Sequence, residues 1–256
     1  MSEALRTEVI DGVLWLTLNR PQARNALNHD LRGRLLDTLR TVAVSPQVRV
    51  VVIRGDDKAF SAGGDVKEMT PDGGTAGKLE TGRSIVDALA RLPKPVVAAV
   101  RGHAAGAGFS MALGSDFVVA DTTAVFRSVF VDRGLVPDMG ATFWLARQVG
   151  LLRAKDIMLT GRPVSAREAH ELGIVARLFE PAGFDAGLTE LVTKLAQGPT
   201  LAYGATKRLL NAAFEAGLSE QLDAEALSQL YATGTQDHRG SVAAFLERRP
   251  HTFRGN

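Results

Sequence analysis

Three near-continuous apolar runs constrain the fold of this chain more than any other feature. They lie at residues 48–53, 96–100 and 117–120, and polar residues do not alternate with the apolar ones. Such runs are typical of parallel strands that are covered on both faces. Glycine turns and helical patterns separate them, so the repeated strand, turn and helix units predict a layered α/β fold.

Local signals predict several further elements in the first half of the chain. Residues 6–19 are expected to form a hairpin around the turn pair Asp11-Gly12. Asn28 is expected to cap a helix with an apolar face. The glycine-rich segment Pro71–Gly77 predicts a mobile loop near the functional site.

Beyond residue 141 the pattern becomes mainly helical, with one strand expected at 174–179. Ser165 and Glu168 have the spacing of a capping box, and Gly173 is expected to end that helix. From about residue 184 the chain is a run of amphipathic helices. These helices either pack on the core or make subunit contacts, and we favour self-association.

Composition excludes several classes of chemistry. The 256 residues include no cysteine, which rules out disulfides and thiolate nucleophiles, and the five histidines have no paired spacing, so no metal centre is expected. Without an apolar leader or a membrane-length apolar run, the expectation is a cytoplasmic protein. The net charge of +2 comes from dispersed basic residues, which favours a small anionic ligand over nucleic acid.

Three apparent motifs fail on their details. Gly73–Lys78 lacks the spacing and the hydroxyl residue of a phosphate-binding loop. Gly106-Ala107-Gly108 starts like a dinucleotide fingerprint, but Met111 stands where its third glycine belongs. Ser61 lies in a sequence like a nucleophile elbow, yet no strand runs directly into it, so a serine hydrolase is a weak alternative.

Two small-residue turns remain, FSAGGD at 60–65 and AAGAG at 104–108. One interpretation is that small residues simply allow close packing. The other is that these turns leave backbone N–H groups unpaired and convergent, and two such groups make an oxyanion hole.

Five segments in order along the chain resemble the enoyl-CoA hydratase/isomerase (crotonase) superfamily. The segments are PQARNAL (21–27), FSAGGDVKEM (60–69), KPVVAAVRGHAAGAGFSMAL (94–113), GLVPDMGAT (134–142) and GRPVSAREAHELGIV (161–175).

This resemblance implies a spiral of β-β-α units over residues 1–190 and a helical oligomerisation region over 191–256. It also implies homotrimers, commonly stacked into hexamers. The substrate would be an acyl-CoA thioester, with coenzyme A as part of the substrate and no separate cofactor. Neither a nucleic-acid partner nor a membrane is implied.

The resemblance also implies site residues. The thioester carbonyl would lie between the N–H groups of Ala62 and Ala107, and Arg24 is either a phosphate contact or an ordinary solvated arginine. The other positions expected to contact the substrate are Ala26, Gly63, Gly64, Asp65, Val66, Gly106, Ser110, Phe130, Leu135 and Pro137.

The chain departs from the hydratases of this family at both of their glutamates. One glutamate belongs four residues after Gly106, where this chain has Ser110, and the other belongs four residues before Gly134, where it has Phe130. A hydroxyl without an adjacent base is a poor proton acceptor, and phenylalanine takes no part in acid–base chemistry. Efficient hydration is therefore not expected.

Three aspartates remain as candidates. Asp138 matches the carboxylate that serves as base in the family's isomerases with Asp after Gly-Leu-x-Pro, and the alternative role is that of a helix cap. Asp132 is expected in a surface ion pair, and Asp65 is expected to brace its loop by accepting N–H groups. One carboxylate suffices to move a proton between two carbons.

We therefore expect an enoyl-CoA isomerase in which Asp138 is the base. The alternatives are a hydratase of low activity that uses Asp138 and bound water, a nucleophilic dehalogenase or thioesterase, and a non-catalytic protein that binds CoA thioesters. An RNA-binding role is disfavoured because the basic residues form no concentrated stripe.

Overall fold

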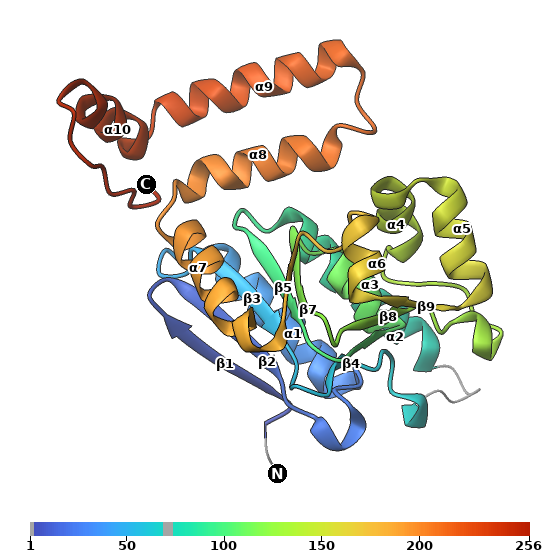
Figure 1. The fold of residues 1–256 in the computed structure, drawn as a ribbon. Helices are drawn as coiled ribbons and strands as arrows, with labels where there is room; N and C mark the ends of the chain where they lie inside the picture. Colours follow the sequence, from blue (N-terminus) through green and yellow to red (C-terminus); the bar gives the residue numbers. More distant parts are fainter. Residues whose placement is uncertain (1–2, 69–73) are drawn as a thin grey trace.

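The computed structural model describes residues 3–68 and 74–256 (Figure 1). Two sheets form its centre, one with the strand order β1-β2-β3-β5-β7-β10 and one with the order β4-β6-β8-β9. The strands of the first sheet are β1 (Leu5–Ile10), β2 (Val13–Leu18), β3 (Val50–Arg54), β5 (Val96–Val100), β7 (Phe117–Asp121) and β10 (Arg177–Phe179). Those of the second are β4 (Ala59–Ser61), β6 (His103–Ala105), β8 (Val125–Arg127) and β9 (Pro163–Ser165).

The first sheet starts with the predicted hairpin of β1 and β2. Asp11 and Gly12 have positive φ values of 49° and 81°, the backbone that a two-residue turn between twisted antiparallel strands requires. From β2 onward the pairing is parallel, through β3, β5 and β7 to β10. The three apolar runs thus form most of the central strands β3 and β7 and all of β5, as predicted.

Alternate residues of the central strands face two separate cores. Val51 and Ile53 of β3 face the larger core, to which α1 (His29–Ala43), α2 (Gly74–Arg91) and α3 (Ala107–Leu113) contribute apolar side chains. Val50 and Val52 face the smaller core under α7 (Phe184–Ala196). Because both faces are covered, these strands have no polar side.

The second sheet consists of short strands that follow the central strands one by one. β4 follows β3 and is succeeded by the α-helix α2. In the same way β6 follows β5 and precedes α3, and β8 follows β7 and precedes the α-helix α4 (Ala141–Val149). The β-β-α unit therefore occurs three times in succession. This confirms the spiral that the resemblance implies.

The remaining helices are α5 (Leu151–Thr160), α6 (Ala166–Glu171), α8 (Thr200–Ala212), α9 (Leu218–Thr233) and α10 (Gln236–Leu246). α8, α9 and α10 lie beyond the two sheets as an outlying group (Figure 1). The expected boundary at 190 falls inside α7, whose buried side chains continue to Ala196. The outlying group therefore begins at Thr200 rather than at residue 191.

Local predictions were mostly confirmed. The Asn28 side chain accepts the Leu31 N–H at 3.0 Å and caps α1, and the Ser165 hydroxyl accepts the Glu168 N–H at 3.2 Å and caps α6. Gly173 follows α6 with a φ of 83°. The strand expected at 174–179 is restricted to β10.

The predicted loop Pro71–Gly77 is only partly within the structure. Residues 71–73 lie outside the described residues, and α2 already begins at Gly74. Among the described helices, none combines the length and the apolar character needed to cross a bilayer.

Candidate functional site

The two glycine turns leave the ends of neighbouring parallel strands. Ser61 of β4 pairs with Ala104 of β6, so the turns that follow lie side by side. Gly63 has a φ of 94°, and a Cβ atom there would stand 2.7 Å from the Ala105 oxygen and 3.2 Å from the Ala107 nitrogen. Only glycine fits this approach, and the two turns are therefore in direct contact.

The Ala62 N–H is already used within the fold. It donates to the Arg24 carbonyl oxygen at 2.9 Å. This bond ties the first glycine turn to the segment before α1, and a donor bound to a protein carbonyl is not free to bind a substrate oxygen. The expectation that Ala62 supplies an oxyanion donor was therefore wrong.

The free donor of the first turn is Gly64. On either side of it, Gly63 donates to the Ser61 hydroxyl at 3.2 Å and Asp65 donates to the Leu27 carbonyl at 3.3 Å. Over the described parts of the chain, the Gly64 N–H donates no hydrogen bond.

The second turn offers an equivalent donor at Ala107. As the first residue of α3, Ala107 has no acceptor one helical turn earlier. Within residues 3–68 and 74–256, no other group accepts its N–H. Gly64 and Ala107 therefore present two unoccupied N–H groups from adjacent turns.

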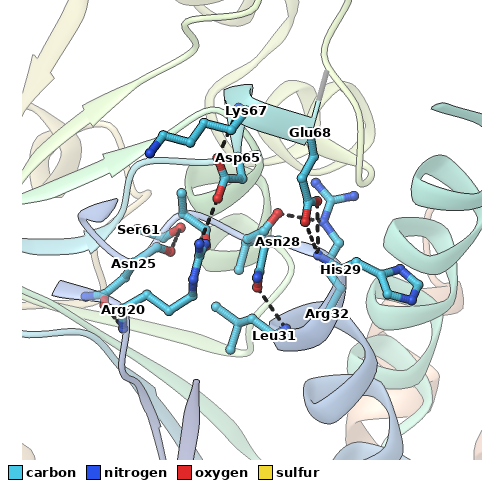
Figure 2. A network of polar contacts seen from close by, with 12 residues as sticks. Arg20, Asn25, Asn28, His29, Leu31, Arg32, Ser61, Asp65, Lys67 and Glu68 are labelled. Atoms are coloured by element: carbon cyan, nitrogen blue, oxygen red, sulfur yellow. Dashed lines mark hydrogen bonds and ion pairs between the residues drawn. The ribbon is translucent and has the colours of Figure 1, made fainter. Parts of the chain in front are cut away.

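A polar network fixes the first turn (Figure 2). Asp65 forms an ion pair with Arg20 at 2.8 Å and accepts the Lys67 N–H at 3.1 Å. Burial by itself raises the pKa of Asp65. The hydrogen bonds from Arg20 and from the Lys67 N–H, together with the positive charges of these two residues, lower it by more, so this pKa lies below its usual value. Glu68 accepts the His29 N–H at the start of α1. The expected bracing role of Asp65 is thus confirmed.

Asp138 lies in the turn before α4, where Met139 and Gly140 have φ values of 50° and 74°. Gly140 is the N-cap residue and no side chain caps this helix, so the capping alternative for Asp138 is wrong. The Asp138 Oδ1 is buried and has no hydrogen-bond partner among the described residues. An unpartnered buried carboxylate oxygen is costly, and it is a mark of a functional position.

Arg32 is the residue of this region that the sequence analysis missed. Its side chain is only 6% exposed, on the face of α1 that also carries Leu35, Leu36 and Leu39. Burial raises the pKa of Asp138, and the positive charge of Arg32 opposes this rise. The sequence pattern that could have revealed it is an arginine on the apolar face of a helix, with leucines three, four and seven residues later.

Neither position that would hold a hydratase glutamate supplies an acid. Ser110 is fully buried, and its hydroxyl donates to the Gly106 carbonyl at 3.2 Å. Phe130 is 9% exposed, and its ring tip lies 3.9 Å from where a Cβ atom on Gly106 would stand. The space beside the second glycine turn is therefore apolar on this side.

The other expected contact residues occupy different environments. Ala26 is buried, Pro137 is half-buried, and Arg24, Val66 and Leu135 are exposed. A phosphate contact of Arg24 stays a prediction.

Asp132 forms an ion pair with Arg127 at 3.0 Å, which confirms its expected surface pairing. In the part of the chain that the structure describes, no group of three or more metal-ligating side chains comes together.

The β-β-α spiral and its two adjacent glycine turns define a protein of the crotonase fold. The chain belongs to the enoyl-CoA hydratase/isomerase family, whose sequence model matches residues 8–256. It is therefore an acyl-CoA enzyme of that family.

Individual relatives match over almost their whole length. The 1,2-epoxyphenylacetyl-CoA isomerase of Escherichia coli is 36% identical over 262 residues, covering 100% of both chains. The 2,3-dehydroadipyl-CoA hydratase of Escherichia coli is 35% identical over 243 residues, covering 95% of both. The crystal structure of enoyl-CoA hydratase from Bacillus anthracis superimposes with a TM-score of 0.94 at 28% identity, covering 99% of this chain and 100% of that chain. Both isomerases and hydratases thus resemble this chain.

Proposed function

We propose that the protein is an enoyl-CoA isomerase that converts a 3-enoyl-CoA into a 2-enoyl-CoA, with Asp138 as its base. One observation carries this proposal: Asp138 is half-buried with one buried oxygen, Oδ1, that has no hydrogen-bond partner among the described residues, whereas Ser110 and Phe130 stand where two glutamates would be needed for hydration. Isomerisation needs one group that takes a proton and returns it, and hydration needs a second group for water.

The two free N–H groups support the anionic intermediate of such a reaction. Removal of the proton next to a thioester places negative charge on its carbonyl oxygen. The N–H groups of Gly64 and Ala107 are unoccupied and fixed in position by the contact between their turns. A donor of this kind contributes about 3–4 kcal/mol to the stabilisation of the transition state.

Asp138 then acts as a proton shuttle. The carboxylate takes a proton from the alpha carbon of the 3-enoyl-CoA, and the electron pair spreads over the conjugated system to the thioester oxygen. The carboxylic acid returns the same proton to the gamma carbon, which leaves the double bond between the alpha and beta carbons. A pKa raised by burial suits this exchange, because the acid and its conjugate base are then closer to balance at neutral pH.

A hydratase of low activity is the second candidate. It is favoured by the hydratase names among the relatives, such as that of 2,3-dehydroadipyl-CoA hydratase. In that reaction Asp138 would activate a bound water and return its proton to the alpha carbon.

We further propose that the acyl-CoA is the complete substrate, with no separate cofactor, and that the chain forms a homotrimer or a dimer of trimers. Exposed apolar side chains on the outlying helices and on the loop between α8 and α9 support the assembly. They are Leu210, Phe214, Leu218, Leu222, Leu227, Leu230, Val242, Phe245 and Leu246.

The test is to incubate the protein separately with a 3-enoyl-CoA and a 2-enoyl-CoA. We expect loss of the 3-enoyl compound, a much slower hydration of the 2-enoyl compound, and abolition of both by Asp138→Asn. Asp132→Asn makes the same isosteric change at a surface carboxylate six residues earlier and should leave the rates unchanged. An untouched 3-enoyl-CoA, or an active Asp138→Asn variant, would contradict the isomerase assignment.

A further inference from the structure

Arg32 is held by backbone groups at the junction of three segments. Its Nε donates to the Leu27 carbonyl at 3.1 Å and its Nη1 donates to the Lys78 carbonyl in α2 at 3.0 Å. The Leu27 carbonyl also accepts the Asp65 N–H next to Gly64. The guanidinium of α1 is thus linked both to α2 and to the first glycine turn.

The same guanidinium lies beside the turn that carries Asp138. A Cβ atom built on Gly82 of α2 would stand 3.9 Å from Arg32 Nη1 and 3.1 Å from the Cγ of Met139, the residue after Asp138. Within the described residues, no hydrogen bond joins Arg32 to Asp138. Its influence on that carboxylate is therefore a charge effect without a direct hydrogen bond.

From α1, Arg32 is the charged group that acts on Asp138, and α2 contributes the Lys78 carbonyl that holds Arg32. On the side of residues 66–68, the Glu68 carboxylate acts on Arg32. Burial lowers the pKa of Arg32 and raises that of Asp138, while each charge favours the other.

We propose that Arg32 is a positioning residue that keeps Asp138 ionised and so ready to accept the substrate proton. This inference rests on the proposed role of Asp138 as the base. Arginine suits the position because its planar group can donate to two carbonyls in different directions and still keep its charge when buried.

The test begins with the ligand-free protein, in which the Asp138 carboxyl is titrated by carbon-13 NMR and identified by its absence in Asp138→Asn. Arg32→Gln removes the charge and keeps a donor, whereas Arg32→Lys keeps the charge. We expect Arg32→Gln to raise the pKa of Asp138 by about one unit or more, and Arg32→Lys to raise it much less.

Arg34→Gln is the matched control. Arg34 is exposed on the same helix, where it pairs with Asp30 and Glu3, and its replacement should leave the Asp138 titration unchanged. The acid limb of the pH profile of kcat/KM should move with the titration, to higher pH in Arg32→Gln and not in Arg34→Gln. If Arg32→Gln does not fold, Arg32→Met supplies the neutral side chain.

The outcomes separate this inference from the proposed function. An unchanged Asp138 titration in a folded neutral variant overturns the role of Arg32, even if Asp138→Asn abolishes isomerisation. A shifted titration in a protein that leaves 3-enoyl-CoA untouched supports the electrostatic link and overturns the isomerase assignment. A uniform loss of kcat at all pH values, with no shift of the acid limb, identifies Arg32 as purely structural.

Discussion

Lys207 of α8 and Asp116, directly before β7, form a partly buried ion pair with 2.7 Å between Nζ and Oδ2. Lys207 also donates to the Leu89 carbonyl at the end of α2, and Asp116 accepts the Val96 N–H of β5. Burial lowers the pKa of Lys207 and raises that of Asp116, and the charge of each partner opposes the shift of the other. The pair attaches the outlying helices to the core.

Loss of one partner should be much more harmful than loss of both charges. Lys207→Met leaves the partly buried Asp116 carboxylate without its cation, which we expect to cost about 1–3 kcal/mol of unfolding free energy. Asp116→Asn added to Lys207→Met should recover part of that loss. Urea denaturation of the two single variants and the double variant checks this, and strictly additive losses would show that the two charges do not interact.

Asp138→Asn should make the protein more stable at neutral pH while it abolishes activity. Since burial raises the pKa of Asp138 in the folded state, its contribution to stability is present below the unfolded pKa of about 3.9 and is lost as pH rises through the folded value. Asparagine carries no charge and avoids that loss. Thermal denaturation should show a higher Tm for the variant at pH 7, and the difference should vanish in strong acid. An equal or lower Tm at pH 7 would contradict the unfavourable burial of this carboxylate.

Gly63→Ala should damage both folding and catalysis. The added Cβ would meet the Ala105 oxygen at 2.7 Å, and the φ of 94° is unfavourable for any residue with a side chain. We expect a loss of about 1–3 kcal/mol and a large fall in kcat. Gly33→Ala is the control: Gly33 is inside α1 with no atom within 4 Å of the added Cβ, so stability should rise by about 0.5–1 kcal/mol.

Ala107→Pro should remove one oxyanion donor and leave the helix in place. Ala107 is the first residue of α3, a position where proline is tolerated because its N–H has no helical acceptor. We expect kcat to fall by about 100- to 1000-fold. Ala107→Gly keeps the N–H and should keep most of the activity, and circular dichroism of both variants checks the fold. Equal activities of the two variants would show that this N–H does not bind the substrate oxygen.

The parts of the fold that were predicted depend on short-range chemistry. The Asp11-Gly12 turn and the Asn28 cap each act on residues within a few positions along the chain. By contrast, β4, β6, β8 and β9 span three residues each, which is too short for an alternating pattern to appear. Their pairing with other short strands is what makes them strands.

The candidate site likewise has features that the sequence determines and features that depend on tertiary packing. The sequence by itself determined the family pattern, the absence of acids at Ser110 and Phe130, and the single carboxylate Asp138. Tertiary structure decided which N–H is free, because the Ala62 N–H is occupied by the Arg24 carbonyl from a distant part of the chain and the Gly64 N–H is not. It also decided that Arg32 lies near Asp138. Hydrogen bonds and charge effects depend on distances in space, and residues far apart along the chain acquire such distances only when the sheets and helices pack.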